Sequence, residues 1–310
     1  MNKRFLGKTG IEISEVGYGA AALFGKDVLG KQGITEEQAY EIIKTAINSG
    51  VTFFDTGINY GYAEERLGRC ITRAMGEGII SRKDIVVETK CGEKVNADGT
   101  YGSSDWSPEW IKKSLEISLK RLQVDYIDLF AMHGGSIKDC TDELIYTFEN
   151  LKSEGIIRAY GINTFETDVI EWVSKEKCFD YVMLDYNVMR QEREPIIKKL
   201  YTGGVGVIAG ASLGQSLYKR EIRFNRNSIW YYMRSIVKFK EMRKRSADFK
   251  FLNSIPGYTS NQLALRYVLD NEYISSAVFN TTSIAHLKEN LRSLEISMPT
   301  EVKKRIQSRG

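Results

Sequence analysis

Three short apolar runs in this sequence each end in a polar side chain that can take part in proton transfer. The runs FFD, VVETK and LFAMH end at Asp55, Lys90 and His133, and Tyr60 follows the first run by five residues. A carboxylate at the end of an apolar run needs a partner, because an unpaired buried charge is very costly. Lys90 is the natural partner for Asp55 if these runs are neighbouring strands.

Together the four side chains suit proton transfer to a carbonyl oxygen. A free phenol has a pKa of about 10, which is too high for easy proton donation at pH 7. A neighbouring ammonium favours the phenolate, so we expect Lys90 to lower the pKa of Tyr60. Asp55 would hold Lys90 charged, and His133 can orient the substrate oxygen or share its proton. This chemistry needs a hydride source but no serine, cysteine or metal cluster.

The chain around these residues alternates between short apolar runs and amphipathic helices. Eight such alternations argue for a parallel sheet and fit a (β/α)₈ barrel, with a doubly wound open sheet as the competing architecture. In a barrel, functional groups lie at the carboxyl ends of the strands, where Asp55, Lys90 and His133 stand. The predicted strands are residues 15–20, 51–56, 85–90, 126–133, 156–162, 180–186, 205–210 and 274–280.

Capping residues and apolar spacing predict the helices between these strands. Thr35 with Gln38 three residues later is a capping-box pattern, and Gly50 ends that helix. Ser107-Pro108-Glu109 opens another helix. A short N-terminal β-hairpin is predicted around residues 7–10. The other predicted helices are residues 141–153, 166–175, 194–201, 259–270 and 283–293, with one more around 228–247.

The composition is ordinary for a globular protein, with 42% hydrophobic and 27% charged residues in 310. We expect one barrel domain over residues 1–310. The sequence has no run of about 18 apolar residues, so no transmembrane helix is predicted. The N-terminus lacks an apolar signal core. Four cysteines without CxxC spacing predict a reduced, cytoplasmic protein.

The net charge of +4 comes from one segment. Residues 219–250 carry eleven Lys/Arg and three Asp/Glu, a local net of +8, so the remainder is near −4. This distribution argues against nucleic-acid or membrane-surface binding. One interpretation is a solvated basic helix. The other is a clamp for the cofactor pyrophosphate or an anionic substrate, because this segment follows strand seven, where barrels commonly bind phosphate. Lys219, Arg220 and Arg223 lie nearest that strand.

Residues 55–68, DTGINYGYAEERLG, resemble the first signature of the aldo-keto reductase superfamily, D-T-A-x-x-Y-G-x-S-E-x-x-L-G. Gly57 and Ala63 replace the Ala and Ser of that signature. The resemblance covers essentially the whole chain. It implies a (β/α)₈ barrel that binds NADPH in an extended form without a Rossmann domain and reduces a small carbonyl compound. The catalytic residues that it implies are Asp55, Tyr60, Lys90 and His133.

The part of the sequence that corresponds to the nicotinamide site departs from the family pattern. The second signature ends in G-[IV]-S-N-F, and residues 161–165 read GINTF, so Asn163 and Thr164 take the places of the Ser and Asn. These two side chains still donate and accept hydrogen bonds. Met183 replaces the Gln on strand six, and Gly210 replaces the aromatic residue that stacks on the nicotinamide.

The nucleotide end is also altered. Asn280 and His286 replace the basic residues that bind the 2′-phosphate in the family, so a weak preference between NADPH and NADH is predicted. Glu289 and Asn290 match the family's adenine contacts. Further predicted cofactor contacts are Ser212, Leu213, Lys219, Thr281 and Thr282, and the candidates for the substrate wall are Phe24, Trp106 and Trp230.

Two other functions stay open beside the reduction of an aldehyde or ketone, of sugar type or otherwise, to the alcohol. GASLG, residues 210–214, spells the G-x-S-x-G of a nucleophile elbow, which would make Ser212 a hydrolase nucleophile with His286 as a partner. That interpretation leaves the four strand-end residues unexplained. The altered nicotinamide site also allows a slow or inactive cofactor-binding regulatory protein of the same fold.

Overall fold

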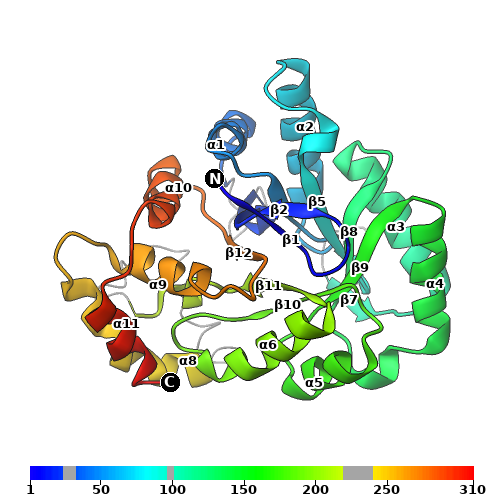
Figure 1. Ribbon diagram of the computed structural model, residues 1–310. Helices are drawn as coiled ribbons and strands as arrows, with labels where there is room; N and C mark the ends of the chain where they lie inside the picture. The colour runs from blue at the N-terminus through cyan, green and yellow to red at the C-terminus, as the bar shows by residue number, and fades with distance from the viewer. Residues whose placement is uncertain (24–32, 96–100, 219–239) are drawn as a thin grey trace.

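Eight parallel strands close into a barrel in the computed structural model, which describes residues 1–23, 33–95, 101–218 and 240–310 (Figure 1). Their order around the barrel is β10-β11-β12-β3-β4-β5-β8-β9. The predicted (β/α)₈ barrel is therefore confirmed, and the competing architecture, a doubly wound open sheet, is wrong. The barrel strands are β3 (Val16–Gly19), β4 (Phe53–Asp55), β5 (Val86–Cys91), β8 (Ile127–His133), β9 (Ile157–Asn163), β10 (Tyr181–Asp185), β11 (Gly206–Gly210) and β12 (Ser276–Phe279).

Helices follow the barrel strands around the outside (Figure 1). The predicted capping box is present, because the Thr35 side chain accepts a hydrogen bond from Gln38 N and the Gln38 side chain accepts one from Thr35 N. The α-helices are α1 (Glu36–Asn48), α2 (Ala63–Gly76), α3 (Pro108–Leu122), α4 (Asp142–Ser153), α5 (Thr167–Glu176), α6 (Glu194–Gly203), α8 (Lys240–Arg245), α9 (Ser260–Leu269), α10 (Ile284–Leu291) and α11 (Thr300–Gln307). Short 3₁₀ helices are η1 (Ala20–Leu23), η2 (Arg82–Asp84), η3 (Ile137–Asp139), η4 (Gln191–Arg193), η5 (Gly214–Ser216), η6 (Ser246–Ser254) and η7 (Arg292–Leu294).

The N-terminal hairpin closes the amino end of the barrel. β1 (Lys3–Phe5) pairs antiparallel with β2 (Glu12–Ser14), which confirms the predicted hairpin. Leu6 between these strands is fully buried and belongs to the apolar cluster inside the barrel. Lys8 N donates to Gly204 O at 3.0 Å, next to the start of β11. The hairpin therefore covers the amino end of the barrel and does not cover the carboxyl ends of the strands, where the functional site is predicted.

Alternation along the strands sorts side chains between the barrel interior and the helix layer. An inner apolar layer lies just above the hairpin. Residues two or four positions further along each strand also point into the barrel, but they lie nearer the carboxyl ends of the strands. The inner cluster consists of Leu6, Ile11, Ile13, Phe53, Val86, Leu129, Ala131, Ala159, Tyr181, Met183, Ile208 and Val278. Asp55, Lys90 and His133 stand two or four residues beyond members of this cluster and therefore point inward above it.

Some elements lie outside the predictions. The predicted elements omit α2, α11 and the two-stranded hairpin of β6 (Glu93–Val95) and β7 (Tyr101–Ser104). The helix predicted around 228–247 is described only from Lys240 onward, as α8, and residues 219–239 lie outside the described residues. Within the described part of the chain, no helix is long and apolar enough to cross a membrane. The four cysteines are free thiols, while the cytoplasmic location and the single domain stay predictions.

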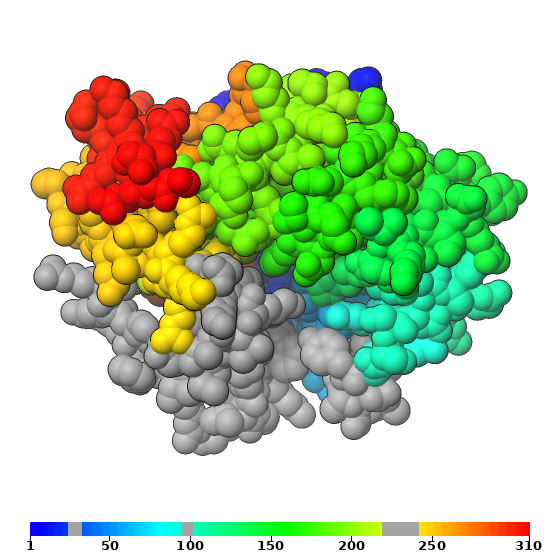
Figure 2. Space-filling model, turned by 90° about the horizontal axis from the view of Figure 1, so that it is seen from below, coloured from blue at the N-terminus to red at the C-terminus, as the bar shows by residue number. Residues whose placement is uncertain are grey.

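The described end of the segment between β11 and α9 packs against the C-terminus. Figure 2 shows α11, in red, beside residues 240–254, in yellow. Arg245 donates to Arg309 O at 3.1 Å, and the Arg305 guanidinium lies 4.0 Å from the centre of the Phe251 ring. These contacts place the C-terminal helix against the described part of the long insertion predicted after strand seven.

Gly68 lies where α2 and α3 approach most closely, so we expect Gly68→Ala to destabilise the protein. A Cβ at position 68 would lie 2.6 Å from the carbonyl oxygens of both Arg121 and Leu122, and these backbone atoms cannot move without shifting α3. We expect a loss of about 1–3 kcal/mol in the free energy of unfolding, measured in urea. Gly76 is the matched control, because it ends the same helix and a Cβ there would meet no atom within 4 Å. A Gly68→Ala variant as stable as Gly76→Ala would contradict the prediction.

Candidate active site

Three neighbouring strands carry Asp55, Lys90 and His133 to one rim of the barrel. Asp55 ends β4 and pairs in register with Glu88 of β5, so Lys90 stands two residues further along. Lys90 in turn pairs with Ala131 of β8, which places His133 two residues beyond it. Tyr60 lies in the loop between β4 and α2. The structure thus brings together the four residues that the sequence singles out, whereas their catalytic roles stay a prediction.

Lys90 and Asp55 form a buried ion pair. The Lys90 ammonium donates to Asp55 Oδ1 and, at 2.7 Å, to Thr56 O, and its side chain is only 1% exposed. Burial alone would lower the pKa of Lys90, but the negative charge of Asp55, with Tyr60 and Glu88, raises it above its usual value. Lys90 is therefore charged at neutral pH, and the predicted pairing with Asp55 is confirmed.

Tyr60 lies between this ion pair and His133. Lys90 Nζ is 5.3 Å from the centre of the Tyr60 ring, and the His133 ring is 5.6 Å away at an interplanar angle of 89°. Burial raises the pKa of Tyr60 to about 12, and Lys90 only partly opposes this. Lys90 lowers the pKa of Tyr60 as expected, but burial and, after it, the surrounding carboxylates outweigh this effect, so the net shift is upward. Tyr60 is consequently a neutral phenol at neutral pH, the form that donates a proton.

Two residues that the sequence reasoning misses contact His133. Asn59 Nδ2 and Glu93 Oε2 each lie 3.1 Å from His133 Nδ1. When Nε2 carries the hydrogen, Asn59 Nδ2 donates to Nδ1, and Nε2 can donate to a substrate carbonyl oxygen. The β6–β7 hairpin places Glu93 here, three residues after Lys90. The signal in the sequence is a carboxylate only three residues after Lys90, the predicted catalytic residue of this strand.

Glu88 is a third missed residue, and it lies inside the barrel below the ion pair. It is fully buried, and Tyr181 Oη donates to Glu88 Oε1 at 3.0 Å. Burial raises the pKa of Glu88 to about 8, although the Lys90 ammonium opposes this. A signal was present in the run VVETK, where Glu88 stands two residues before Lys90 and so on the same face of the strand.

The predicted nicotinamide contacts lie on the next three strands. Asn163 ends β9, where its Nδ2 donates to Met183 O at 3.4 Å, and Thr164 N donates to the same oxygen at 3.0 Å. Met183 is buried on β10, and a Cβ added to Gly210 would lie 3.2 Å from Met183 Cγ. The Met183 side chain therefore lies against Gly210. The two departures from the family pattern are neighbours in space.

Other predicted cofactor residues lie after β11 and β12. Ser212 is buried and donates to Val278 O at 2.7 Å, and Leu213 packs against the core. Among the hydrogen bonds of the described residues, none joins Ser212 to a histidine, and His286 is exposed on α10, so the hydrolase interpretation lacks its base. Lys219 lies outside the described residues.

The start of α10 suits a phosphate group. Ser283 caps this helix by accepting from His286 N, Thr281 Oγ1 accepts from Ser283 N at 3.1 Å, and no acidic residue lies in the first turn. Helix N-termini of this kind favour anions. Asn280, Thr282 and His286 are exposed there, Glu289 is partly buried, and buried Asn290 pairs with Asn261. This donor set fits the phosphate end of a dinucleotide.

Trp106 is the one predicted substrate-wall residue that lies within the described ranges. Its ring packs on the backbone after Lys90 and after His133, since a Cβ on Gly92 would overlap the ring and one on Gly135 would approach it to 3.3 Å. Trp106 therefore borders the site beside His133. Phe24 and Trp230 lie outside the described residues, as do Arg220 and Arg223 of the predicted clamp.

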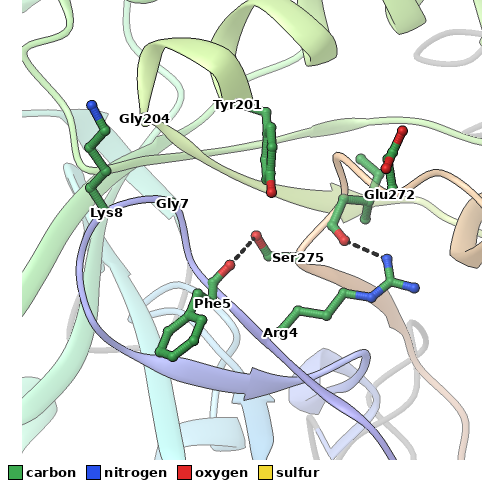
Figure 3. A pocket seen from close by; sticks show the side chains of 9 residues that line it. Arg4, Phe5, Gly7, Lys8, Tyr201, Gly204, Glu272 and Ser275 are labelled. Carbon is green, nitrogen blue, oxygen red and sulfur yellow. Dashed lines mark hydrogen bonds between the residues drawn. The ribbon is translucent and has the colours of Figure 1, made fainter.

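A cavity of about 340 Å³ lies at the opposite end of the barrel (Figure 3). It lies between the hairpin and the starts of β11 and β12. Its lining residues include Arg4, Lys8, Tyr201 and Glu272. Arg4 donates to Ile274 O at 2.7 Å, and Ser275 Oγ donates to Phe5 O at 3.0 Å. None of the predicted functional residues lines this cavity, so it is separate from the rim that carries Asp55, Lys90 and His133.

Comparisons with known proteins match this architecture. A family model described as "Aldo/keto reductase family" matches residues 15–309. The chain is 30% identical over 309 residues to "Uncharacterized oxidoreductase YqkF" of Bacillus subtilis (97% of this chain, 94% of the relative). It is 29% identical over 303 residues to L-galactose dehydrogenase of Arabidopsis thaliana (94% and 87%). The holo form of aldo-keto reductase AKR11C1 from Bacillus halodurans is 27% identical, with a TM-score of 0.78, over 100% of this chain and 96% of that chain.

Proposed function

Because the chain belongs to the aldo/keto reductase family, we propose that it reduces an aldehyde or ketone to the alcohol with NADPH or NADH. Family membership supports an oxidoreductase with a nicotinamide cofactor and a small carbonyl substrate in general. The observation that carries the specific proposal is the buried Lys90–Asp55 ion pair beside the neutral phenol of Tyr60.

The reaction needs a proton at the carbonyl oxygen while the carbon is reduced. A reduced nicotinamide, when bound, supplies the hydride that the carbonyl carbon accepts. As the C=O electrons move to oxygen, Tyr60 donates its hydroxyl proton there and becomes a phenolate. Lys90 stabilises that phenolate and Asp55 holds Lys90 in place. His133 orients the carbonyl by donating from Nε2, while Asn59 Nδ2 donates to the other ring nitrogen. The same groups allow the reverse oxidation.

The residues that would hold the cofactor run along one side of the rim. Asn163 and Thr164 would contact the carboxamide, and Met183 with Gly210 would border the ring. The start of α10, with Thr281 and Thr282, would receive phosphate. The substitution of Met183 and Gly210 for the family's Gln and aromatic residue also favours a second candidate function, a cofactor-binding regulatory protein with slow turnover.

Fluorescence titration with NADPH and NADH, followed by a panel of carbonyl substrates, tests the two functions. Carbonyl reduction requires cofactor binding together with turnover of at least one substrate. Tight binding without turnover on a broad panel would favour the regulatory protein. Binding of neither nucleotide would exclude both.

We propose a hydroxylated, sugar-type carbonyl compound as the substrate. A relative is named L-galactose dehydrogenase, and the carboxylate of Glu93 is 28% exposed beside His133, where it can accept hydrogen bonds from hydroxyl groups. The Trp106 ring adds a flat apolar surface nearby. Higher kcat/KM for aldoses than for simple aldehydes of similar length is the expected result, and the opposite order would contradict it.

We expect the preference between NADPH and NADH to be less than about tenfold in Kd, or about 1.4 kcal/mol. Exposed Asn280 and His286 stand where the family's basic residues bind the 2′-phosphate, and neither offers the bidentate guanidinium or the ammonium of such a residue. Titration with both nucleotides checks this, and His286→Arg should shift the preference toward NADPH. A thousandfold preference for NADPH in the wild type would mean that a basic residue elsewhere binds the phosphate.

A further inference from the structure

Glu88 lies inside the barrel, in contact with the catalytic cluster but not assigned to it by the proposed mechanism. It is fully buried on β5, two residues before Lys90 and in register with Asp55 of β4. The ionisable groups around it are Asp55 from β4, Lys90 from its own strand, and Tyr181 from β10. β8, the other neighbour of β5, presents the apolar side chains Leu129 and Ala131.

The charges in this cluster do not balance if both acids are ionised. One ammonium, Lys90, would face two buried carboxylates, Asp55 and Glu88, and an excess buried charge is costly. The hydrogen bonds show the same imbalance. Tyr181 donates to Glu88 Oε1, whereas Glu88 Oε2 is buried without a hydrogen-bond partner. Asp55 and Glu88 are in-register neighbours on β4 and β5, so their side chains lie on the same face of the sheet, and Asp55 raises the pKa of Glu88. A proton shared between them removes the excess charge and supplies the missing donor.

We propose that Glu88 is a positioning residue of the carbonyl reduction, which carries a proton at neutral pH, donates a hydrogen bond to Asp55 and leaves Asp55 as the only negative partner of Lys90. The raised pKa of Glu88, about 8, agrees with this geometry. The positioning role rests on the proposed function, whereas the protonation of Glu88 does not.

The neutral form of Glu88 helps Tyr60 to release its proton. As Tyr60 donates, negative charge develops on its oxygen, and Lys90 stabilises that charge best when no further carboxylate competes for the ammonium. Ionised Glu88 would act on Tyr60 in the direction that raises its pKa. Reduction should therefore slow as Glu88 loses its proton, while the cofactor stays bound.

The protonation itself is tested by thermal unfolding of the wild type and Glu88→Gln between about pH 5 and pH 9. The pKa of Glu88 is about 8 in the folded protein and near the ordinary 4.5 when unfolded, so the folded state holds the proton more tightly. Its contribution to stability is present in full below about pH 4.5 and is lost as pH rises to about 8. Glutamine does not titrate, so the Tm of the variant minus that of the wild type should rise over this window. A difference that stays constant overturns the proposal.

Glu64→Gln is the matched control for the unfolding experiment. Glu64 is also fully buried, but it lies on α2 and pairs with Arg121 at 3.1 Å and with the Thr89 hydroxyl at 2.6 Å, outside the barrel interior. If the Tm of Glu64→Gln minus that of the wild type rose equally with pH, the effect would not come from the Asp55–Glu88 pair. That result would also overturn the proposal.

The positioning role is tested by the pH dependence of kcat at saturating cofactor. If only the protonated form of Glu88 supports reduction, wild-type kcat should fall by about tenfold between pH 7 and pH 9, and the ratio of kcat for Glu88→Gln to the wild type should rise accordingly. Tyr181→Phe removes a hydrogen bond that lowers the pKa of Glu88. In this variant the fall of kcat should therefore occur at higher pH than in the wild type. Superimposable profiles for all three proteins overturn the role. A wild type that reduces no carbonyl compound refutes the proposed function instead, and the unfolding comparison still decides whether Glu88 is protonated.

Discussion

Tyr60→Phe is expected to abolish carbonyl reduction and to leave cofactor binding nearly unchanged. The substitution removes the hydroxyl that donates the proton but keeps the ring, which packs against His133 and beside Lys90. General acid catalysis is typically worth about 10²–10⁴-fold, so kcat should fall by that factor. Steady-state kinetics measure kcat, and fluorescence titration of the nucleotide measures Kd on the same preparations.

Tyr62→Phe is the matched control for that variant. Tyr62 lies two residues further along the same loop, its side chain is 51% exposed, and it has no place in the catalytic cluster, so its loss should leave kcat near that of the wild type. A Tyr60→Phe variant that keeps more than about a tenth of the activity would show that the proton comes from another group. His133 would then be the nearest candidate.

The rim of the barrel is predictable from the sequence because its residues obey a local rule. Asp55, Lys90 and His133 each end an apolar run, and parallel strands bring their carboxyl ends to one edge. The period of two along each strand also predicts that all three point inward. The capping box at Thr35 is similarly local, since it depends on residues three positions apart.

Properties that depend on the whole environment are not predictable in this way. The sequence places Lys90 near Tyr60 and gives the sign of its effect on the pKa of the phenol, but it does not show the burial that outweighs this effect and raises that pKa. The contact of Glu93 with His133 depends on the fold of the β6–β7 hairpin. The contact between Met183 and Gly210 needs the register of β10 and β11. Each of these facts arises from long-range packing rather than from local spacing.

Lys90→Met should remove activity and destabilise the fold together. The ammonium pairs with Asp55 and only 1% of the Lys90 side chain is exposed, so its loss leaves a buried carboxylate without a counterion. Breaking a buried pair from one side typically costs about 3–5 kcal/mol, which urea unfolding at pH 7 should detect. Reduction should fall by at least about 10²-fold, because the phenolate of Tyr60 loses the cation that stabilises it.

The double variant Asp55→Asn/Lys90→Met separates the two consequences. Replacing both partners leaves no uncompensated charge, so most of the stability lost in Lys90→Met should return. Activity should not return, because the cation next to Tyr60 is still absent. A double-mutant cycle on the free energy of unfolding then gives the coupling between the partners, and the same cycle on kcat gives their catalytic coupling. If the double variant regained activity along with stability, Lys90 would act only by holding the fold, and the proton transfer assigned to Tyr60 would not depend on its charge.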